Sequence, residues 1–258
     1  MPGAAKLIEQ ARADLARGDG IAAEVDLKKA LAAGARREAV AARMGEAMLD
    51  QGERGKAREW LASGQFTPEE ALHGLRMLGR LERLEGNLAA AGQAYDRALA
   101  INGKDAGLWV DIGRLRYAGG EHVQAIEAAD HALTLDPANA RALEFRAEIV
   151  RDQFGLAASL PWFEAALAHD PDDLEALGEY AATLGDLGRA KDMLAVTRHM
   201  LERDGGNPQA FYLQAILAAR AGDDGLARTM LEKVGDRFNN VPGAMLLDSV
   251  LNLRSGNY

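Results

Sequence analysis

The five histidines are the first residues that could carry chemistry, because imidazole serves both as a general base and as a metal ligand. They are His73, His122, His131, His169 and His199. No two of them have the four-residue spacing at which a helix presents a histidine pair to one metal ion. We therefore predict no metal site and interpret each histidine as a packing or surface residue.

Nucleophiles and phosphate-binding loops are equally sparse. The chain has no cysteine, and none of its serines lies in a Gly-x-Ser-x-Gly sequence. Segment 51–56 has two glycines and a lysine, but the glycine spacing is wrong for a phosphate loop and no Ser or Thr follows the lysine. The acidic turn 222–225 is too short for a calcium loop. We predict that this chain is not an enzyme and holds no cofactor.

Composition narrows the class further. The 258 residues are 48% hydrophobic but only 5% aromatic, and the formal charge of -9 argues against a nucleic-acid partner. No stretch approaches the roughly 20 apolar residues that a membrane-spanning helix needs, so we predict no membrane insertion. The first residues lack the apolar segment of a leader. We expect a cytoplasmic location, or a periplasmic one if a leader was removed.

The sequence repeats with a period of 34 residues, and this period predicts the helices that must position any site. Repeats begin at residues 4, 38, 72, 106, 140, 174 and 208, without insertion or deletion, and 242–258 begins an eighth. The eighth position is always small: Ala11, Gly45, Gly79, Gly113, Ala147, Ala181, Ala215 and Ser249. The fifteenth position is Gly18, Gly52, Gly86, Gly120, Phe154, Gly188, Gly222 and Gly256. Glycine there predicts a tight turn between two helices, which we expect Gly155 to make in the exceptional repeat.

Sequence signals for the start of a helix lie near the boundaries between repeats. Asp136, Asp170 and Asn207 each precede a proline, which predicts an N-cap followed by proline at the first helical position. Thr67 and Glu70 have the spacing of a capping box, which predicts an early start for the first helix of the third repeat.

The fourth repeat shows most of the pattern, with Trp109, Gly113, Gly120, Ala125, Ala132 and Pro137. This pattern resembles the tetratricopeptide repeat family over nearly the whole chain, although Ala129 stands where the family has an aromatic residue. The resemblance implies an all-α, right-handed superhelical solenoid of antiparallel helix pairs. It also implies a non-enzymatic scaffold for protein–protein interaction. Segment 23–31 is similar to repeats of bacterial envelope proteins.

The resemblance also implies a binding groove, because in this family the first helix of each repeat lines a concave surface that receives peptides. The corresponding positions here hold arginines and aromatic residues: Arg76, Arg80, Arg83, Arg114, Tyr117, Arg141, Phe145 and Arg151. Since guanidinium matches carboxylate geometry, the expected partner is a protein or peptide, in particular an acidic one. The alternative is that these arginines pair with carboxylates of the same surface, such as Glu144, Glu148 and Asp152.

The carboxyl end has a different character. Its groove positions are apolar, namely Tyr212, Leu213, Ile216, Leu246, Leu247 and Val250. We predict that 242–258 is either the first helix of an incomplete eighth repeat, or a capping helix whose exposed face supports a homo-oligomer. The corresponding alternative function is a repeat arm of a larger protein, mediating self-assembly or carrying a catalytic domain absent from this chain.

Overall fold

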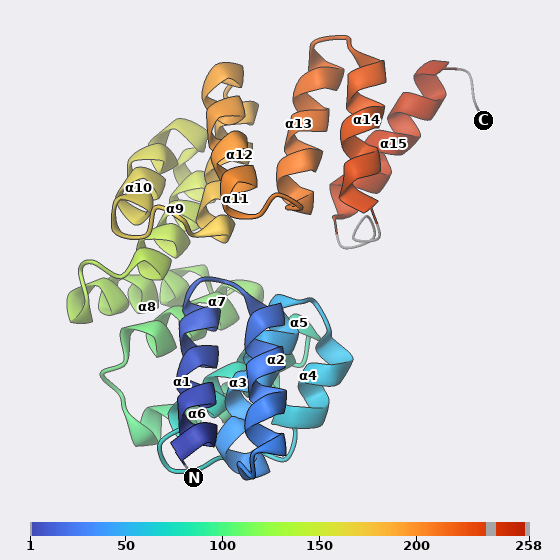
Figure 1. Ribbon diagram of the computed structural model, residues 1–258. Coiled ribbons are helices and arrows are strands. Elements are labelled where there is room, and N and C mark those ends of the chain that lie inside the picture. Colours follow the sequence, from blue (N-terminus) through green and yellow to red (C-terminus); the bar gives the residue numbers. More distant parts are fainter. Residues whose placement is uncertain (1, 236–240, 256–258) are drawn as a thin grey trace. The chain divides into compact units, whose positions relative to one another are not determined.

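The computed structural model describes residues 2–235 and 241–255, and this part of the chain contains fifteen α-helices and no strand (Figure 1). The helices are α1 (Pro2–Ala16), α2 (Gly20–Ala32), α3 (Arg37–Asp50), α4 (Arg54–Leu61), α5 (Ala71–Leu84), α6 (Leu88–Ile101), α7 (Ala106–Ala118), α8 (His122–Leu135), α9 (Ala140–Phe154), α10 (Leu156–His169), α11 (Leu174–Asp186), α12 (Ala190–Arg203), α13 (Pro208–Arg220), α14 (Asp224–Val234) and α15 (Pro242–Ser255). The all-α class is therefore confirmed. None of the described helices is long and apolar enough to cross a membrane.

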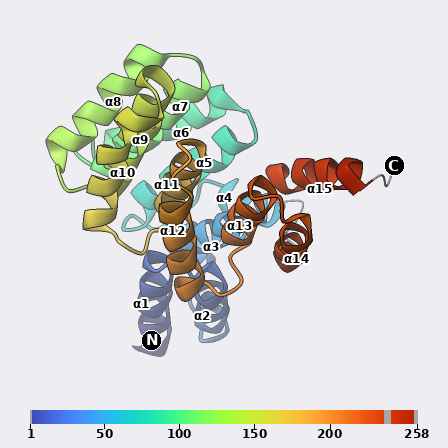
Figure 2. The same cartoon turned by 90° about the horizontal axis from the view of Figure 1, so that it is seen from above.

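The chain forms two compact units, Met1–Arg146 and Ala147–Tyr258. In the first unit the pairs α1–α2, α3–α4, α5–α6 and α7–α8 pack as helical hairpins, and the first helices also contact one another in the order α1, α3, α5, α7. In the second unit, α11 packs on α12 and α13 on α14, while α15 lies against α13 and α14 (Figure 2). How the hairpins divide into repeats, and what role 242–258 has, stay predictions. The turn predicted at Gly256 lies outside the described residues.

Left-handed glycines join the two helices of each pair. They are Gly18, Gly52, Gly86, Gly120, Gly188 and Gly222, with φ between 75° and 82°. Gly155 has a φ of 95° directly after Phe154, so the predicted shift of this turn by one residue is confirmed. A β-carbon would crowd the backbone in this conformation.

Small residues at the eighth repeat position allow the helices of a pair to touch. A β-carbon at Gly45 would overlap the side chain of Leu61, and one at Gly79 would overlap the ring of Tyr95. Because both Leu61 and Tyr95 are buried, each pair interlocks through side chains of its second helix that fill the space left on the first.

Only one of the three predicted Asx-Pro helix starts is confirmed. Asn207 caps α13, where its side chain accepts a 2.9 Å hydrogen bond from the backbone N–H of Ala210. Asp136 instead follows the end of α8, and Asn139 caps α9 three residues later by accepting from the backbone of Ala142. Asp170 likewise ends α10. Because proline also tolerates a turn conformation, it lies in the link between two helices here rather than in the first helical turn.

The predicted capping box is wrong. Residues 68–70 form a turn, and α5 begins at Ala71. The carboxylate of Glu70 would have to reach back to the backbone of Thr67, but it is engaged by the guanidinium groups of Arg12 and Arg43. A tertiary ion pair has displaced a local capping interaction.

Candidate functional site: a charged face on the first helices

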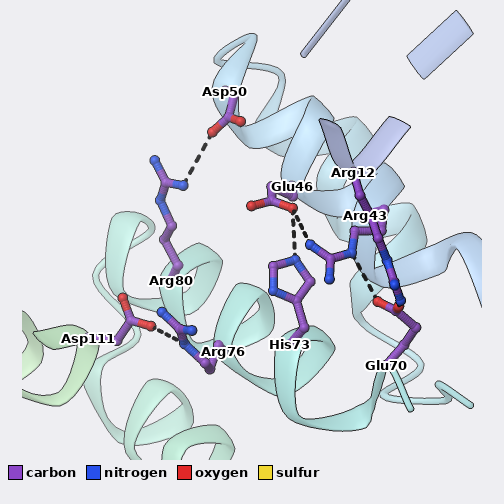
Figure 3. A network of polar contacts seen from close by, with 9 residues as sticks. All are labelled: Arg12, Arg43, Glu46, Asp50, Glu70, His73, Arg76, Arg80 and Asp111. Atoms are coloured by element: carbon purple, nitrogen blue, oxygen red, sulfur yellow. Dashed lines mark hydrogen bonds and ion pairs between the residues drawn. The ribbon is translucent and has the colours of Figure 1, made fainter. Parts of the chain in front are cut away.

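Ion pairs connect charged side chains of α1, α3, α5, α7 and the start of α9 across the first unit. Figure 3 shows the part of this network that runs from Arg12 to Asp111. We call this surface the charged face. It comprises Arg12, Arg43, Glu46, Asp50, Glu70, His73, Arg76, Arg80, Asp111, Arg114, Arg141 and Glu144. Because hairpins place first helices beside one another, residues about one repeat apart in sequence meet here.

Asp111 on α7 lies at the centre of one part of the charged face. Its side chain is 3% exposed, and its Oδ2 accepts a 2.7 Å hydrogen bond from Nε of Arg76 on α5. Its Oδ1 lies 3.7 Å from Nη2 of Arg141. Burial alone would raise the pKa of Asp111, but the charges of Arg76 and Arg141 outweigh it and hold this pKa below its ordinary value. The buried carboxylate therefore stays ionised and connects three helices.

A second part of the charged face connects α1, α3 and the start of α5. Glu70 is buried and pairs with Arg12 and with Nε of Arg43, the latter at 3.1 Å. Nε2 of His73 lies 2.8 Å from Oε2 of Glu46. Burial acts to raise the pKa of Glu46, but the hydrogen bond and charge of His73 and the charge of Arg43 lower it overall. These pairs fix the stacking of consecutive first helices.

A third part of the charged face surrounds Asp50, at the end of α3. Nη1 of Arg80 lies 3.3 Å from Oδ1 of Asp50. Burial raises the pKa of Asp50 above its ordinary value, although the charges of Arg80 and Arg141 oppose the rise. The exposed fractions of the Arg80 and Arg141 side chains are 24% and 38%, against 13% for Arg76. Arg80 and Arg141 are therefore the partly exposed guanidinium groups in this part of the charged face.

No family model and no curated protein sequence matches the chain. Among solved structures, a tetratricopeptide repeat protein from Parabacteroides merdae is similar with a TM-score of 0.63 and 17% identity, covering 97% of this chain and 99% of that one. Yeast Tom70 is similar with a TM-score of 0.65 and 16% identity over 98% of this chain and 54% of Tom70. The chain has the tetratricopeptide-repeat fold. A third similar structure is the hetero-tetramer of Cut9 and Hcn1 from the APC/C, with a TM-score of 0.63 and 15% identity over 82% of this chain and 42% of that one.

The structure places the predicted arginines of this tetratricopeptide-repeat fold in different surroundings. Arg76, Arg80 and Arg141 converge around Asp50 and Asp111, as described above. Arg114 points Nη2 at Oε2 of the buried Glu144, 3.2 Å away. Internal pairing, which was the alternative interpretation of the sequence, thus describes each of these arginines in the absence of a ligand.

Phe145 is the clearest correction among the predicted site residues. Its side chain is 1% exposed, and its ring packs at Gly113 and edge-on to Tyr117, with 6.3 Å between the centroids. Phe145 therefore offers no surface to a peptide. Because Gly113 on α7 has no side chain, the ring of Phe145 on α9 enters the core at this point.

The two remaining arginines have separate roles. Arg83, at the end of α5, lies beside the buried hydroxyl of Tyr95, whose pKa is raised chiefly by burial. Arg151 belongs to the second unit, where its Nη1 lies 2.6 Å from Oε2 of Glu179 on α11. Arg151 is therefore not part of the charged face.

Sequence reasoning missed Arg12, Arg43, Asp50 and Glu70, although the sequence contained a signal for most of the pairs. The partners Arg80 and Asp50 stand 30 residues apart, and Arg76 and Asp111 stand 35 apart. Opposite charges at a separation near the repeat length indicate contacts between neighbouring first helices. Which of several candidate charges actually pair depends on side-chain direction, and only the tertiary structure resolves that.

The predicted apolar surface of the second unit is smaller than expected. Leu213 is buried against the neighbouring pair, whereas Tyr212, Ile216, Leu247 and Val250 are half-buried. Leu246 on α15 is 69% exposed, and Leu253, seven residues later, is 60% exposed. Two helical turns separate them, so they lie on one face of α15. The described residues contain no group of three side chains suited to hold a metal ion.

Proposed function

We propose that this chain is a protein-interaction scaffold whose charged face binds an acidic segment of another protein. The fold supports the general part of the proposal, since Cut9, which has a similar fold, assembles with a second protein, Hcn1. The observation that carries the specific part is the pair of partly exposed guanidinium groups, Arg80 and Arg141, which lie against the neighbouring carboxylates of Asp50 and Asp111.

The arrangement favours an incoming carboxylate for an electrostatic reason. The 3.3 Å pairing of Asp50 with Arg80 is partly exposed on both sides, so solvent screens it and an incoming carboxylate can compete for the guanidinium. A carboxylate that bonds both Arg80 and Arg141 keeps its negative charge and gains hydrogen bonds with charged donors. The tighter 2.7 Å contact between Arg76 and Asp111 stays in place and keeps the helices in register. The proposed contact residues are therefore fewer than those predicted from the sequence.

Fluorescence anisotropy with two labelled peptides tests the proposal. The first is a ten-residue peptide with three aspartates and a free carboxyl terminus, and the second carries asparagines and a terminal amide instead. We expect the acidic peptide to bind wild type, and the Arg80→Ala, Arg141→Ala double variant to bind it at least ~10-fold more weakly, because charged hydrogen bonds contribute about 1.5–3 kcal/mol each. Added salt should weaken this binding.

The matched control is the Arg189→Ala, Arg203→Ala double variant. It removes the same charge from two α12 arginines whose side chains are each 45% exposed. Equal binding of both peptides, or an equal loss in the two double variants, would show that net charge rather than the charged face is responsible.

Self-association through α15 is the second candidate function. Leu246 and Leu253 expose large apolar side chains on one face of this helix. Such a face is stabilised when a second apolar surface covers it, and a second copy of the chain carries the same face.

A further inference from the structure

A polar contact joins successive hairpins at three junctions of this chain. A side chain on the second helix of one hairpin bonds a residue 27 positions later, at the end of the next hairpin's first helix. The pairs are Glu24 with Gln51 at 3.0 Å, Arg58 with Glu85 at 3.1 Å, and Arg228 with Ser255 at 3.0 Å.

The junction between α6 and α7 lacks this contact, because glycine occupies both positions. Gly92 and Gly119 are 27 residues apart and both line a pocket of about 390 Å³. A β-carbon at Gly92 would come no closer than 3.9 Å to Leu115, and one at Gly119 no closer than 3.4 Å to a backbone oxygen. Gly119 has a φ of -81°, which any residue adopts. Neither packing nor backbone conformation requires these glycines, so their effect is to leave the pocket open.

The walls of this α6–α7 pocket suit an apolar group. Leu88, Leu99, Ile112 and Leu115 line it together with the indole of Trp109. The indole N–H donates a 2.8 Å hydrogen bond to the carbonyl oxygen of Gly103. The ring of His131 packs edge-on against the indole, with 4.4 Å between the ring centroids. Because Trp109 is already fixed, a ligand would lose little entropy in ordering it. The volume lies within the range of protein pockets that bind small groups.

The rim of the pocket is acidic. Exposed carboxylates of Asp96 and Glu121 border it, and Glu127 borders an adjoining hollow that shares Trp109 and Arg116. Arg116 pairs with Glu121 at 2.8 Å. The guanidinium of Arg116 and the imidazole of His131 thus face three carboxylates, and the surplus of acidic groups favours a positively charged group on whatever enters.

We propose that the α6–α7 pocket receives a large apolar side chain from a segment of a partner protein, with a lysine or arginine next to it that meets the acidic rim. This site is independent of the charged face. With about 100° of rotation per residue, Trp109 and Arg116 lie on the opposite side of α7 from Asp111 and Arg114. The two surfaces also have opposite preferences, since the charged face favours acidic ligands and the pocket favours basic ones.

Another junction of this chain supplies the residue pair for a variant that closes the pocket. The Gly92→Arg, Gly119→Glu double variant installs the pair that Arg58 and Glu85 form one junction earlier. Random twelve-residue peptides displayed on phage are selected on wild type after depletion on this variant. We expect the surviving peptides to share a large apolar residue beside lysine or arginine. A synthetic copy of a survivor should bind the closed variant at least tenfold more weakly and bind the Arg80→Ala, Arg141→Ala variant as tightly as wild type.

Several results would overturn this proposal. A selection without survivors would contradict it, as would survivors whose lysines can be replaced by glutamine without loss of binding. A wild-type dimer in light scattering that the closed variant does not form would assign the pocket to a second copy of the chain. Circular dichroism establishes that the closed variant is folded, and Gly92→Leu fills the same space without adding charge. Unweakened peptide binding to folded Gly92→Leu would likewise place the ligand elsewhere. The charged-face peptide assay uses different variants, so failure of either site leaves the other test intact.

Discussion

Asp111→Asn removes the negative charge on which the centre of the charged face depends while keeping the side chain nearly isosteric. In wild type the carboxylate is almost wholly buried, accepts a hydrogen bond from Arg76 and attracts Arg141. The asparagine oxygen can still accept one hydrogen bond, but the guanidinium of Arg76, of which 13% is exposed, loses its nearest counter-charge. The change therefore isolates the electrostatic contribution from packing.

The expected cost follows from the enclosure of each partner. Breaking a buried ion pair by removing one member costs about 3–5 kcal/mol. Arg76 keeps a 3.3 Å contact with Asp105, which places the expected loss near the lower end, at about 3 kcal/mol. Arg141 is 38% exposed and 3.7 Å away, so its share is at most about 1 kcal/mol because solvent screens it.

Urea unfolding followed by far-ultraviolet circular dichroism measures this loss, and a double-mutant cycle with Arg76→Met separates the pairwise part. Each single variant leaves one buried charge without its nearest partner, whereas the double variant removes both charges. We expect a coupling energy of at least about 1.5 kcal/mol between the two sites. A loss below about 0.5 kcal/mol for Asp111→Asn, or additive losses in the cycle, would refute the view that this pair fixes the helices.

Three further predictions use single changes. Gly79→Ala should lower the thermal midpoint, with a loss of stability of about 1–3 kcal/mol, because its β-carbon overlaps the buried ring of Tyr95. Gly92→Ala should raise the midpoint, with a gain of about 0.5–1 kcal/mol, because the site is open and alanine favours helix. Changes of the same sign in the two melts would contradict this. The pKa of Asp111 is lowered in the folded state, so its ionised carboxylate stabilises the fold above the ordinary aspartate pKa of about 4. This stabilisation is lost as the pH falls through the folded pKa, so the urea midpoint of wild type should fall more between pH 7 and pH 3 than that of Asp111→Asn. Parallel falls in the two proteins would exclude this contribution of Asp111. Leu246→Asp should reduce the mass that light scattering records at high protein concentration, and an unchanged mass would rule out association through this side chain.

The repeat period was sufficient to predict the helical fold, and the glycine turns show why. A tight link between two helices needs one left-handed residue, and glycine supplies it at the same place in each hairpin. This requirement is local, so a sequence pattern reveals it. Even the displaced turn at Gly155 followed from its neighbour in sequence.

The helix starts show where local reasoning stops. Thr67 and Glu70 have the spacing of a capping box, yet Glu70 pairs with Arg12, 58 residues away. The same holds at Phe145, where the repeat position suggests a surface side chain. Gly113 on α7 leaves space for the ring of Phe145, and removal of this apolar ring from water stabilises the fold.

The sequence by itself thus determined the elements of this protein, because turn chemistry and small-residue spacing act within one hairpin. Only the tertiary structure decided how the charges are shared, since a guanidinium can pair with a carboxylate about one repeat away as readily as with a ligand. It also revealed the α6–α7 pocket. Gly92 and Gly119 are unremarkable in the sequence, and they leave an open space because two separate helices bring them to the same level.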